Sequence, residues 1–233
     1  MNSPARILDS LFGAVLFDLD GTLVDTAPDM VAVLQAMQKA YDVAPVPYEI
    51  GRRYVSNGSI GLLRLGFPDS DIDIGHSFHS EFLDRYAEVV CKDSRVFAGI
   101  DRLLAQLEGA DCPWGVVTNK PEYLTTPLME ALGLASRSAC IVGGDTLSVR
   151  KPDPGPLLLA CDMAGVEPHK TLYVGDALRD IEAGLAAGMT TIAAGYGYIT
   201  EDDDPTSWGA DVIAADTEEL AQIVLKAVNL GGS

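Results

Sequence analysis

Short apolar runs that favour β-strands alternate with helical patterns along most of this chain, and this alternation constrains the fold more than any other feature. Segments with apolar residues at helical spacing, such as IDRLLAQLE and DIEAGLAA, separate these runs. Because strand, helix and strand in sequence place successive strands parallel, we expect an α/β core, a Rossmann-like parallel sheet with helices on both faces. The apolar runs are GAVLF, PWGVV, ACIVG, TLYVG, TTIAA and ADVIAA.

One interval interrupts the alternation. Between about residues 25 and 95 the sequence holds helical patterns, such as MVAVLQAMQKAY and FHSEFLDRYAEVV, and no strand-like run. We therefore predict a core domain made of residues 1–24 and 96–233, with a helical cap domain over residues 25–95 inserted after the first strand. A chain of 233 residues is long enough for both.

The charge balance limits the partners of the protein. With 34 acidic and 16 basic side chains, the formal net charge is −18. A general nucleic-acid binder is excluded, because phosphate backbones are held by clusters of Lys and Arg. The first apolar run is short and is interrupted by Asp18 and Asp20, so we expect no cleaved signal, no membrane span and a cytoplasmic protein. No heptad pattern indicates a coiled coil, and a monomer or a weak homodimer is expected.

Polar side chains stand at the ends of three predicted strands. Asp18, Thr118 and Asp176 each follow an apolar run directly. In an open parallel sheet, ligands bind beyond the carboxyl ends of the strands, so these side chains are expected in one crevice. Asp20 lies two residues after Asp18, and both side chains project to the same side if the strand geometry persists.

A positive partner is needed for this concentration of carboxylates. GDALRD places Asp176 and Asp180 one helical turn apart, at the same end of the sheet as Asp18 and Asp20. A divalent cation such as Mg²⁺ takes carboxylate and carbonyl oxygens and explains the whole set, whereas a helix N-terminus explains Asp176 alone. Further groups that suit an anion are the ammonium groups of Lys120 and Lys151, the Thr118 hydroxyl and the backbone amides near Gly21.

Other catalytic classes lack their residues. His76, His79 and His169 are the only histidines, none follows a predicted strand, and the first two are expected on a solvent-exposed helix face. The sequence contains no G-x-S-x-G, no G-x-G-x-x-G after the first strand and no G-x-x-x-x-G-K-[ST]. A carboxylate nucleophile remains as the expected catalytic group.

The segments DLDGT, VVTNK, KPDP and GDALRD resemble, in this order, the four motifs of the haloacid dehalogenase-like hydrolase superfamily, and the resemblance covers essentially the whole chain. The helical interval is similar to the cap of the branch that includes phosphoglycolate phosphatases and β-phosphoglucomutases. DGTLVDTAPD, VSNG and KPDPGPLL look most like bacterial phosphoglycolate phosphatases. WGVVTNKP and YGYI…WGAD look nearer a sister group that acts on N-acetylmuramic acid 6-phosphate.

The resemblance implies a Mg²⁺-dependent phosphomonoesterase that works through an aspartyl phosphate. It assigns the attack on phosphorus to Asp18. Asp20 protonates the leaving group and then activates water. The cation is expected on the Asp18 carboxylate, the Asp20 carbonyl and the Asp176 carboxylate, with Asp180 steadying Lys151 or a metal-bound water. The residues expected around the phosphoryl group are Thr118, Asn119, Lys151 and Gly21.

The substrate is expected to be a small phosphate ester that carries a carboxylate. Arg52, Arg53 and Arg64 flank VSNGSIG, which we predict to be a polar loop closing over the core site. An arginine fork suits a carboxylate. The cap residues expected at the substrate are Arg52, Asn57 and Gly58, although solvent-exposed helix faces would also explain the arginines.

Several activities fit the motifs. 2-Phosphoglycolate is the first candidate substrate, and N-acetylmuramic acid 6-phosphate hydrolysis or a sugar phosphomutase reaction is the alternative. Dehalogenases of the superfamily lack the second aspartate, so Asp20 disfavours that activity. A phospho-accepting receiver domain is much shorter and has no helical insert.

Overall fold

The computed structural model describes residues 12–228, and its core is a six-stranded sheet in which every paired strand is parallel. The strand order is β5-β4-β1-β6-β7-β8. The α/β class with a parallel sheet is therefore confirmed. The strands are β1 (Ala14–Phe17), β4 (Trp114–Val117), β5 (Ile141–Val142), β6 (Thr171–Gly175), β7 (Thr190–Ala194) and β8 (Val212–Ala214).

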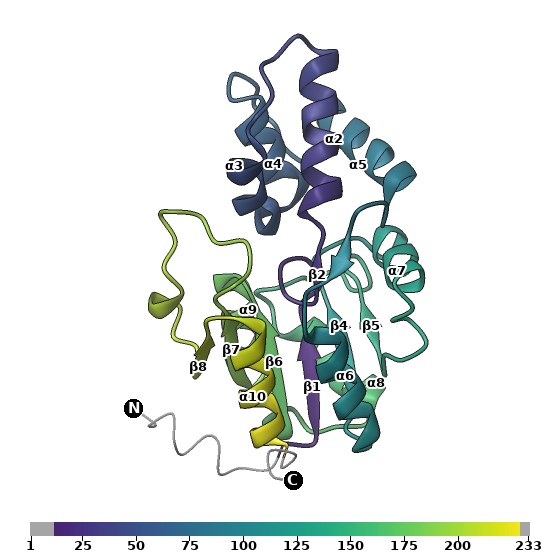
Figure 1. Ribbon diagram of the computed structural model, residues 1–233, viewed down its shortest axis with the longest axis vertical. Coiled ribbons are helices and arrows are strands. Elements are labelled where there is room, and N and C mark those ends of the chain that lie inside the picture. The colour runs from purple at the N-terminus through teal and green to yellow at the C-terminus, as the bar shows by residue number, and fades with distance from the viewer. Residues whose placement is uncertain (1–11, 229–233) are drawn as a thin grey trace.

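Helices cover both faces of this sheet (Figure 1), and all four residues of strand β1 are therefore buried. Val15 and Phe17 of β1 belong to one apolar cluster, together with side chains of α6 (Ile100–Gly109), α7 (Glu122–Ala131) and α10 (Thr217–Ala227). Leu16 belongs to another, with α8 (Gly155–Ala164) and α9 (Leu178–Ala186). The alternation of side chains along a strand thus divides the core into two layers. Within residues 12–228, no helix is both long and apolar enough to cross a membrane.

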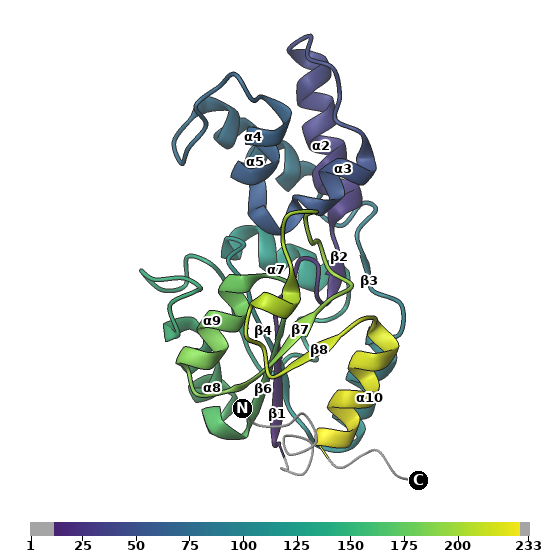
Figure 2. The same ribbon diagram turned by 90° about the vertical axis from the view of Figure 1, so that its left-hand side faces the viewer.

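Four helices form a separate unit above the sheet (Figures 1 and 2). Their apolar cluster includes Leu34, Met37, Leu62 and Phe82, and it extends to Leu124 of α7 and to Tyr198. Below them, β2 (Val24–Asp25) and β3 (Arg95–Val96) pair antiparallel, a two-residue ladder that the sequence did not predict. The domain limits after residues 24 and 95 stay a prediction. The helices are α2 (Ala27–Ala40), α3 (Tyr48–Arg53), α4 (Gly58–Gly66) and α5 (Ser77–Val89), with a 3₁₀ turn, η1 (Val55–Asn57), before α4.

The sheet topology identifies one edge as the place for a ligand. From β1 the chain runs to β4 and β5 on one side, and it then returns to β6 on the other side of β1. Ligands of open α/β sheets bind at such a switch point, beyond the carboxyl ends of the strands. This edge of the sheet faces the helical unit (Figure 2).

Candidate active site

The polar side chains predicted at strand ends lie directly after three adjacent strands of the sheet. Asp18 follows β1, Thr118 follows β4 and Asp176 follows β6. Ladder-like hydrogen bonds fix the first two, because the Asp18 N–H donates to Val174 O at 2.8 Å and the Thr118 N–H to Val142 O at 2.9 Å. The three side chains are almost completely buried.

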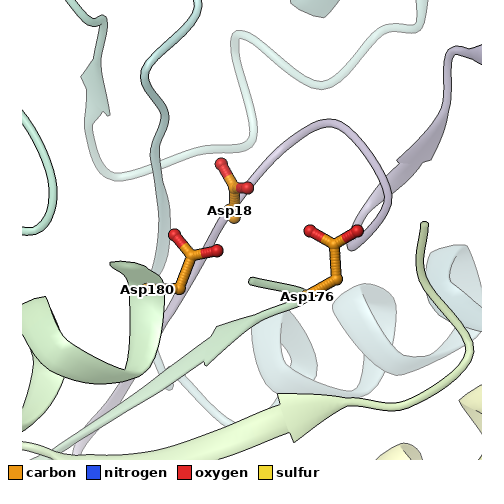
Figure 3. A group of neighbouring side chains, drawn as sticks. All are labelled: Asp18, Asp176 and Asp180. Carbon is orange, nitrogen blue, oxygen red and sulfur yellow. The ribbon is translucent and has the colours of Figure 1, made fainter. Parts of the chain in front are cut away.

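Three carboxylates gather at this point (Figure 3). One oxygen from each of Asp18, Asp176 and Asp180 lies within 4.8 Å of the others, and all three residues are buried. Within residues 12–228, Oδ1 of Asp18 and Oδ1 of Asp176 have no hydrogen-bond donor. Buried carboxylate oxygens without a hydrogen-bond donor are unfavourable, and such oxygens are the ligands that Mg²⁺ and Ca²⁺ take. The cluster could therefore hold a divalent metal ion.

The backbone around Asp176 leaves no room for another side chain. Its Oδ2 accepts hydrogen bonds from the Tyr198 N–H at 2.8 Å and from the Ser56 hydroxyl at 2.5 Å. A Cβ at Gly21 would lie 2.0 Å from this oxygen, and the φ of Gly21 is +82°. Glycine is required there for both reasons. The Gly21 N–H donates to Val24 O at 3.0 Å, so the expected use of this amide for a phosphoryl group is not supported.

Burial, together with the negative charges of Asp18 and Asp180, raises the pKa of Asp176 from 3.8 to about 7. Between pH 3.8 and about pH 7 the Asp176 carboxyl of the folded chain keeps a proton that the unfolded chain has released. The stability of the fold therefore falls as the pH rises through this window. Above pH 7 the buried carboxylate is ionised, and a cation offsets the cost.

This titration predicts that Mg²⁺ raises the unfolding temperature of the protein strongly at pH 8 and little at pH 5, where the cation must displace a proton. Thermal unfolding with and without Mg²⁺ at both pH values measures the effect. Asp176→Asn is the control and should reduce the increment at pH 8. Equal increments at pH 5 and pH 8 would contradict the assignment.

Lys151 supplies the buried positive charge of the site. Its Nζ lies 2.7 Å from Asp180 Oδ1 and 2.9 Å from Asp18 Oδ1, and the side chain is 0% exposed. It also donates to Val117 O and to the Tyr173 hydroxyl, both at 2.8 Å. The contact with Asp18 lacks the angle of a hydrogen bond, whereas the contacts with the strand carbonyl and the tyrosine fix the ammonium group beside Asp18.

Asn119 holds the backbone of Lys151 rather than pointing at a ligand. Its Nδ2 donates to Lys151 O at 2.9 Å, and its Oδ1 accepts from the Lys151 N–H at 3.1 Å. Both ends of the amide are occupied. Asn119 lines the pocket, and these two hydrogen bonds hold the backbone of Lys151, while a direct contact with the phosphoryl group stays a prediction.

Asp20 is held by two donors from different parts of the chain. Its Oδ1 accepts from the Thr26 hydroxyl at 2.6 Å and from Lys120 Nζ at 3.0 Å. The Lys120 ammonium also lies 4.4 Å from the ring centroid of Tyr86 on α5. The helical unit therefore contacts the group that orients Asp20.

A pocket of about 610 Å³ lies between the two units. The sheet edge contributes the expected residues Asp18, Asp20, Thr118 and Lys151 to its lining. The helical unit contributes polar and apolar side chains. His79 is partly exposed, and it lines the pocket with its Nε2 3.1 Å from the Ser59 hydroxyl. The cap residues at the pocket include Asn57 and Gly58, as the sequence predicts, with Ser59, Ile60, His79 and Phe82.

Arg52 lies elsewhere. Its Nη1 is 2.5 Å from Asp25 Oδ1, and its guanidinium stacks 4.8 Å from the ring centroid of Tyr198. The Tyr198 hydroxyl donates to the same Asp25 oxygen at 2.7 Å. This cluster lies where α3 meets β2, and Arg52 is not among the residues that line the pocket. The arginine therefore joins the helical unit to the core instead of reaching the substrate position predicted for it.

Sequence reasoning missed several residues of the site. Thr26 and Ser56 orient carboxylates, and both stood inside segments already singled out, DGTLVDT and VSNG. Arg150 and Arg179 line the pocket, and each is a direct neighbour of a motif residue, Lys151 or Asp180. Their proximity in sequence to the motifs was an available signal for the two arginines.

Comparison with known proteins identifies the relatives of this chain. The chain is 47% identical over 216 residues to the N-acetylmuramic acid 6-phosphate phosphatase of Pseudomonas aeruginosa, covering 92% of this chain and 96% of that protein. It is 45% identical over 207 residues to the phosphoglycolate phosphatase of Xanthomonas campestris pv. campestris, covering 89% and 94%. The crystal structure of a predicted phosphoglycolate phosphatase from Haemophilus somnus superimposes with a TM-score of 0.79 at 27% identity, covering 91% and 98%. Residues 15–194 match the model of the haloacid dehalogenase-like hydrolases, and the chain belongs to this family.

Proposed function

We propose that this phosphatase hydrolyses a phosphate ester that carries a carboxylate, by transfer of the phosphoryl group to Asp18. The observation that carries the proposal is the placement of a buried Asp18 carboxylate beside the Lys151 ammonium, in the lining of a pocket. A carboxylate nucleophile of this kind forms an aspartyl phosphate, which water then hydrolyses.

The residues of the sheet edge divide the chemistry between them. Lys151 stabilises negative charge on the transferring group, and the Thr118 hydroxyl is placed to donate to one of its oxygens. Asp20, oriented by Thr26 and Lys120, gives a proton to the leaving oxygen and later takes one from the attacking water. Asp18 and Asp176 would hold Mg²⁺ together with the Asp20 carbonyl, and the cation supplies charge neutralisation at the phosphoryl oxygens.

The helical unit shapes the substrate position and excludes water from it. Ile60, Phe82 and Tyr86 provide apolar surface, while Asn57, Ser59 and His79 provide hydrogen-bonding groups. This mixture suits a sugar ring with hydroxyl and amide substituents. At about 610 Å³ the pocket falls in the range of roughly 300–1,000 Å³ that holds drug-sized ligands.

Two substrates are therefore retained. The pocket volume and the 47% identity to the Pseudomonas aeruginosa enzyme favour N-acetylmuramic acid 6-phosphate. The 45% identity to the Xanthomonas campestris enzyme favours 2-phosphoglycolate, a much smaller molecule with the same two charged groups. Both carry one phosphate ester and one carboxylate.

Phosphate release with Mg²⁺ tests the proposal on four compounds: the two candidates, N-acetylglucosamine 6-phosphate and β-glucose 1-phosphate. We expect the highest kcat/KM for N-acetylmuramic acid 6-phosphate. A higher value for 2-phosphoglycolate would select the second candidate. Equal or better turnover of N-acetylglucosamine 6-phosphate, which lacks the lactyl carboxylate, would refute carboxylate recognition, and conversion of glucose 1-phosphate to the 6-phosphate would indicate a mutase.

A further inference from the structure

Among the described residues, the part of the pocket that the helical unit lines contains no lysine and no arginine. The three arginines that flank VSNGSIG are engaged elsewhere: Arg52 with Asp25, Arg53 with Glu201, and Arg64 with Ile72 O. His79 is the one basic side chain that the helical unit adds to the described pocket lining, and burial lowers its pKa, which favours the neutral imidazole. The charge that meets a substrate carboxylate must therefore come from the core.

The core contributes four cationic side chains to the pocket lining, and two of them are already paired. Lys120 contacts Asp20, and Lys151 contacts Asp18 and Asp180. Arg150 and Arg179 have no ion pair and no side-chain hydrogen bond within residues 12–228. Asp145 is the other carboxylate in the lining, and its Oδ1 accepts from the Glu122 N–H at 2.7 Å.

The two arginines stand on segments that the buried ion pair holds together. Arg150 directly precedes Lys151, and Arg179 directly precedes Asp180 on the first turn of α9, while Lys151 Nζ and Asp180 Oδ1 are 2.7 Å apart. Arg150 is exposed and Arg179 is partly buried. The two arginines of the pocket lining thus differ in their exposure to solvent.

We propose that Arg150 and Arg179 form the subsite that binds the substrate carboxylate, so that carboxylate specificity resides in the core and not in the helical unit. The identity of the substrate rests on the proposed function. A planar guanidinium matches a carboxylate with two parallel hydrogen bonds, whereas the phosphoryl position already has the Thr118 hydroxyl and the Lys151 ammonium. The helical unit then contributes shape and neutral hydrogen bonds to the rest of the molecule.

A matched pair of substrates isolates this role. N-acetylmuramic acid 6-phosphate and N-acetylglucosamine 6-phosphate differ only in the lactyl group and its carboxylate. Arg179→Met should lower the ratio of their kcat/KM values by about tenfold to a hundredfold. Arg150→Met should lower it less, because its guanidinium is exposed and more strongly screened by solvent.

In both variants the lower kcat/KM for the carboxylate substrate should result from a higher KM. The kinetics with N-acetylglucosamine 6-phosphate should be little affected. Arg179→Lys should restore part of the ratio. Arg102→Met is the matched control, because Arg102 is exposed on α6 and outside the pocket. An unchanged ratio in both arginine variants would overturn the subsite. An equal loss on both substrates would also overturn it, and would place the arginines on the phosphoryl group.

A second measurement does not depend on the natural substrate. Two phosphonates are compared as inhibitors of 4-nitrophenyl phosphate hydrolysis, because 3-phosphonopropionate differs from propylphosphonate by a carboxylate in place of a methyl group. The wild type should prefer the carboxylate-bearing inhibitor, and Arg179→Met should lose that preference. If neither candidate ester is hydrolysed, the proposed function fails while this inhibitor preference still decides the subsite. Equal inhibition of the wild type by both phosphonates would refute the subsite on its own.

Discussion

Asp18→Asn is expected to lower the rate of phosphate release by roughly 10⁴-fold or more while the protein stays folded. The amide cannot attack phosphorus, and it removes one negative charge from a cluster in which three carboxylates lie within 4.8 Å of one another. The unfolding temperature should therefore remain unchanged or rise. Steady-state phosphate release and thermal unfolding measure the two quantities.

The control for this variant is Asp202→Asn, which changes the same residue type on an exposed loop. It should leave both the rate and the unfolding temperature unaltered. Turnover of Asp18→Asn at more than about one hundredth of the wild-type rate would mean that another group attacks phosphorus.

Lys151→Met is expected to abolish activity and to destabilise the fold. The ammonium is completely buried and contacts two carboxylates, one carbonyl and one hydroxyl. Its removal leaves the Asp18 and Asp180 carboxylates buried without that cation, and breaking a buried ion pair from one side costs about 3–5 kcal/mol. Denaturant unfolding monitored by circular dichroism gives the loss directly.

Lys170→Met provides the comparison. Lys170 Nζ lies 2.7 Å from Glu167 Oε2, but its side chain is 57% exposed, and such surface pairs contribute at most about 1 kcal/mol. A loss of stability for Lys151→Met no larger than that for Lys170→Met would show that the interior ion pairs of the site do not stabilise the fold.

The strand ends were predictable because two simple regularities meet there. Apolar runs that alternate with helical patterns predict a parallel sheet, and a parallel sheet brings all its carboxyl ends to one edge. Asp18, Thr118 and Asp176 follow three strands that prove to be neighbours in the order β4-β1-β6. Their convergence needed no knowledge of side-chain packing, only that the strands pair and that the polar residues follow them.

The contribution of the helical unit was not predictable in the same way. Helical spacing identifies an apolar face, but it does not tell which polar side chains beside that face will meet another unit. Arg52 is held by Asp25 and Tyr198, which lie 27 and 146 residues away in the sequence, and His79 points into the pocket. Both positions depend on how the helices sit over the sheet edge.

The hydrogen bonds of the backbone at the site were equally unpredictable from the sequence. The glycine of DLDGT suggested a free amide for a phosphate, but the chain turns so that the Gly21 N–H donates to Val24 O. The same turn brings Gly21 against the Asp176 carboxylate. The glycine correctly indicated a special backbone position. The structural reason is that the backbone at Gly21, after β1, lies against the Asp176 side chain, after β6.

The central claim is that the Asp18 carboxylate accepts the phosphoryl group, and trapping the phosphoenzyme tests it most directly. Asp20→Asn should slow the hydrolysis of the intermediate, while 4-nitrophenyl phosphate has a leaving group that needs no proton. With Mg²⁺, the variant should release a burst of 4-nitrophenolate equal to the enzyme concentration. Mass spectrometry of the acid-quenched digest should find one phosphoryl group on the peptide that contains Asp18. Steady turnover without a burst, or a phosphoryl group on any other residue, would contradict the account.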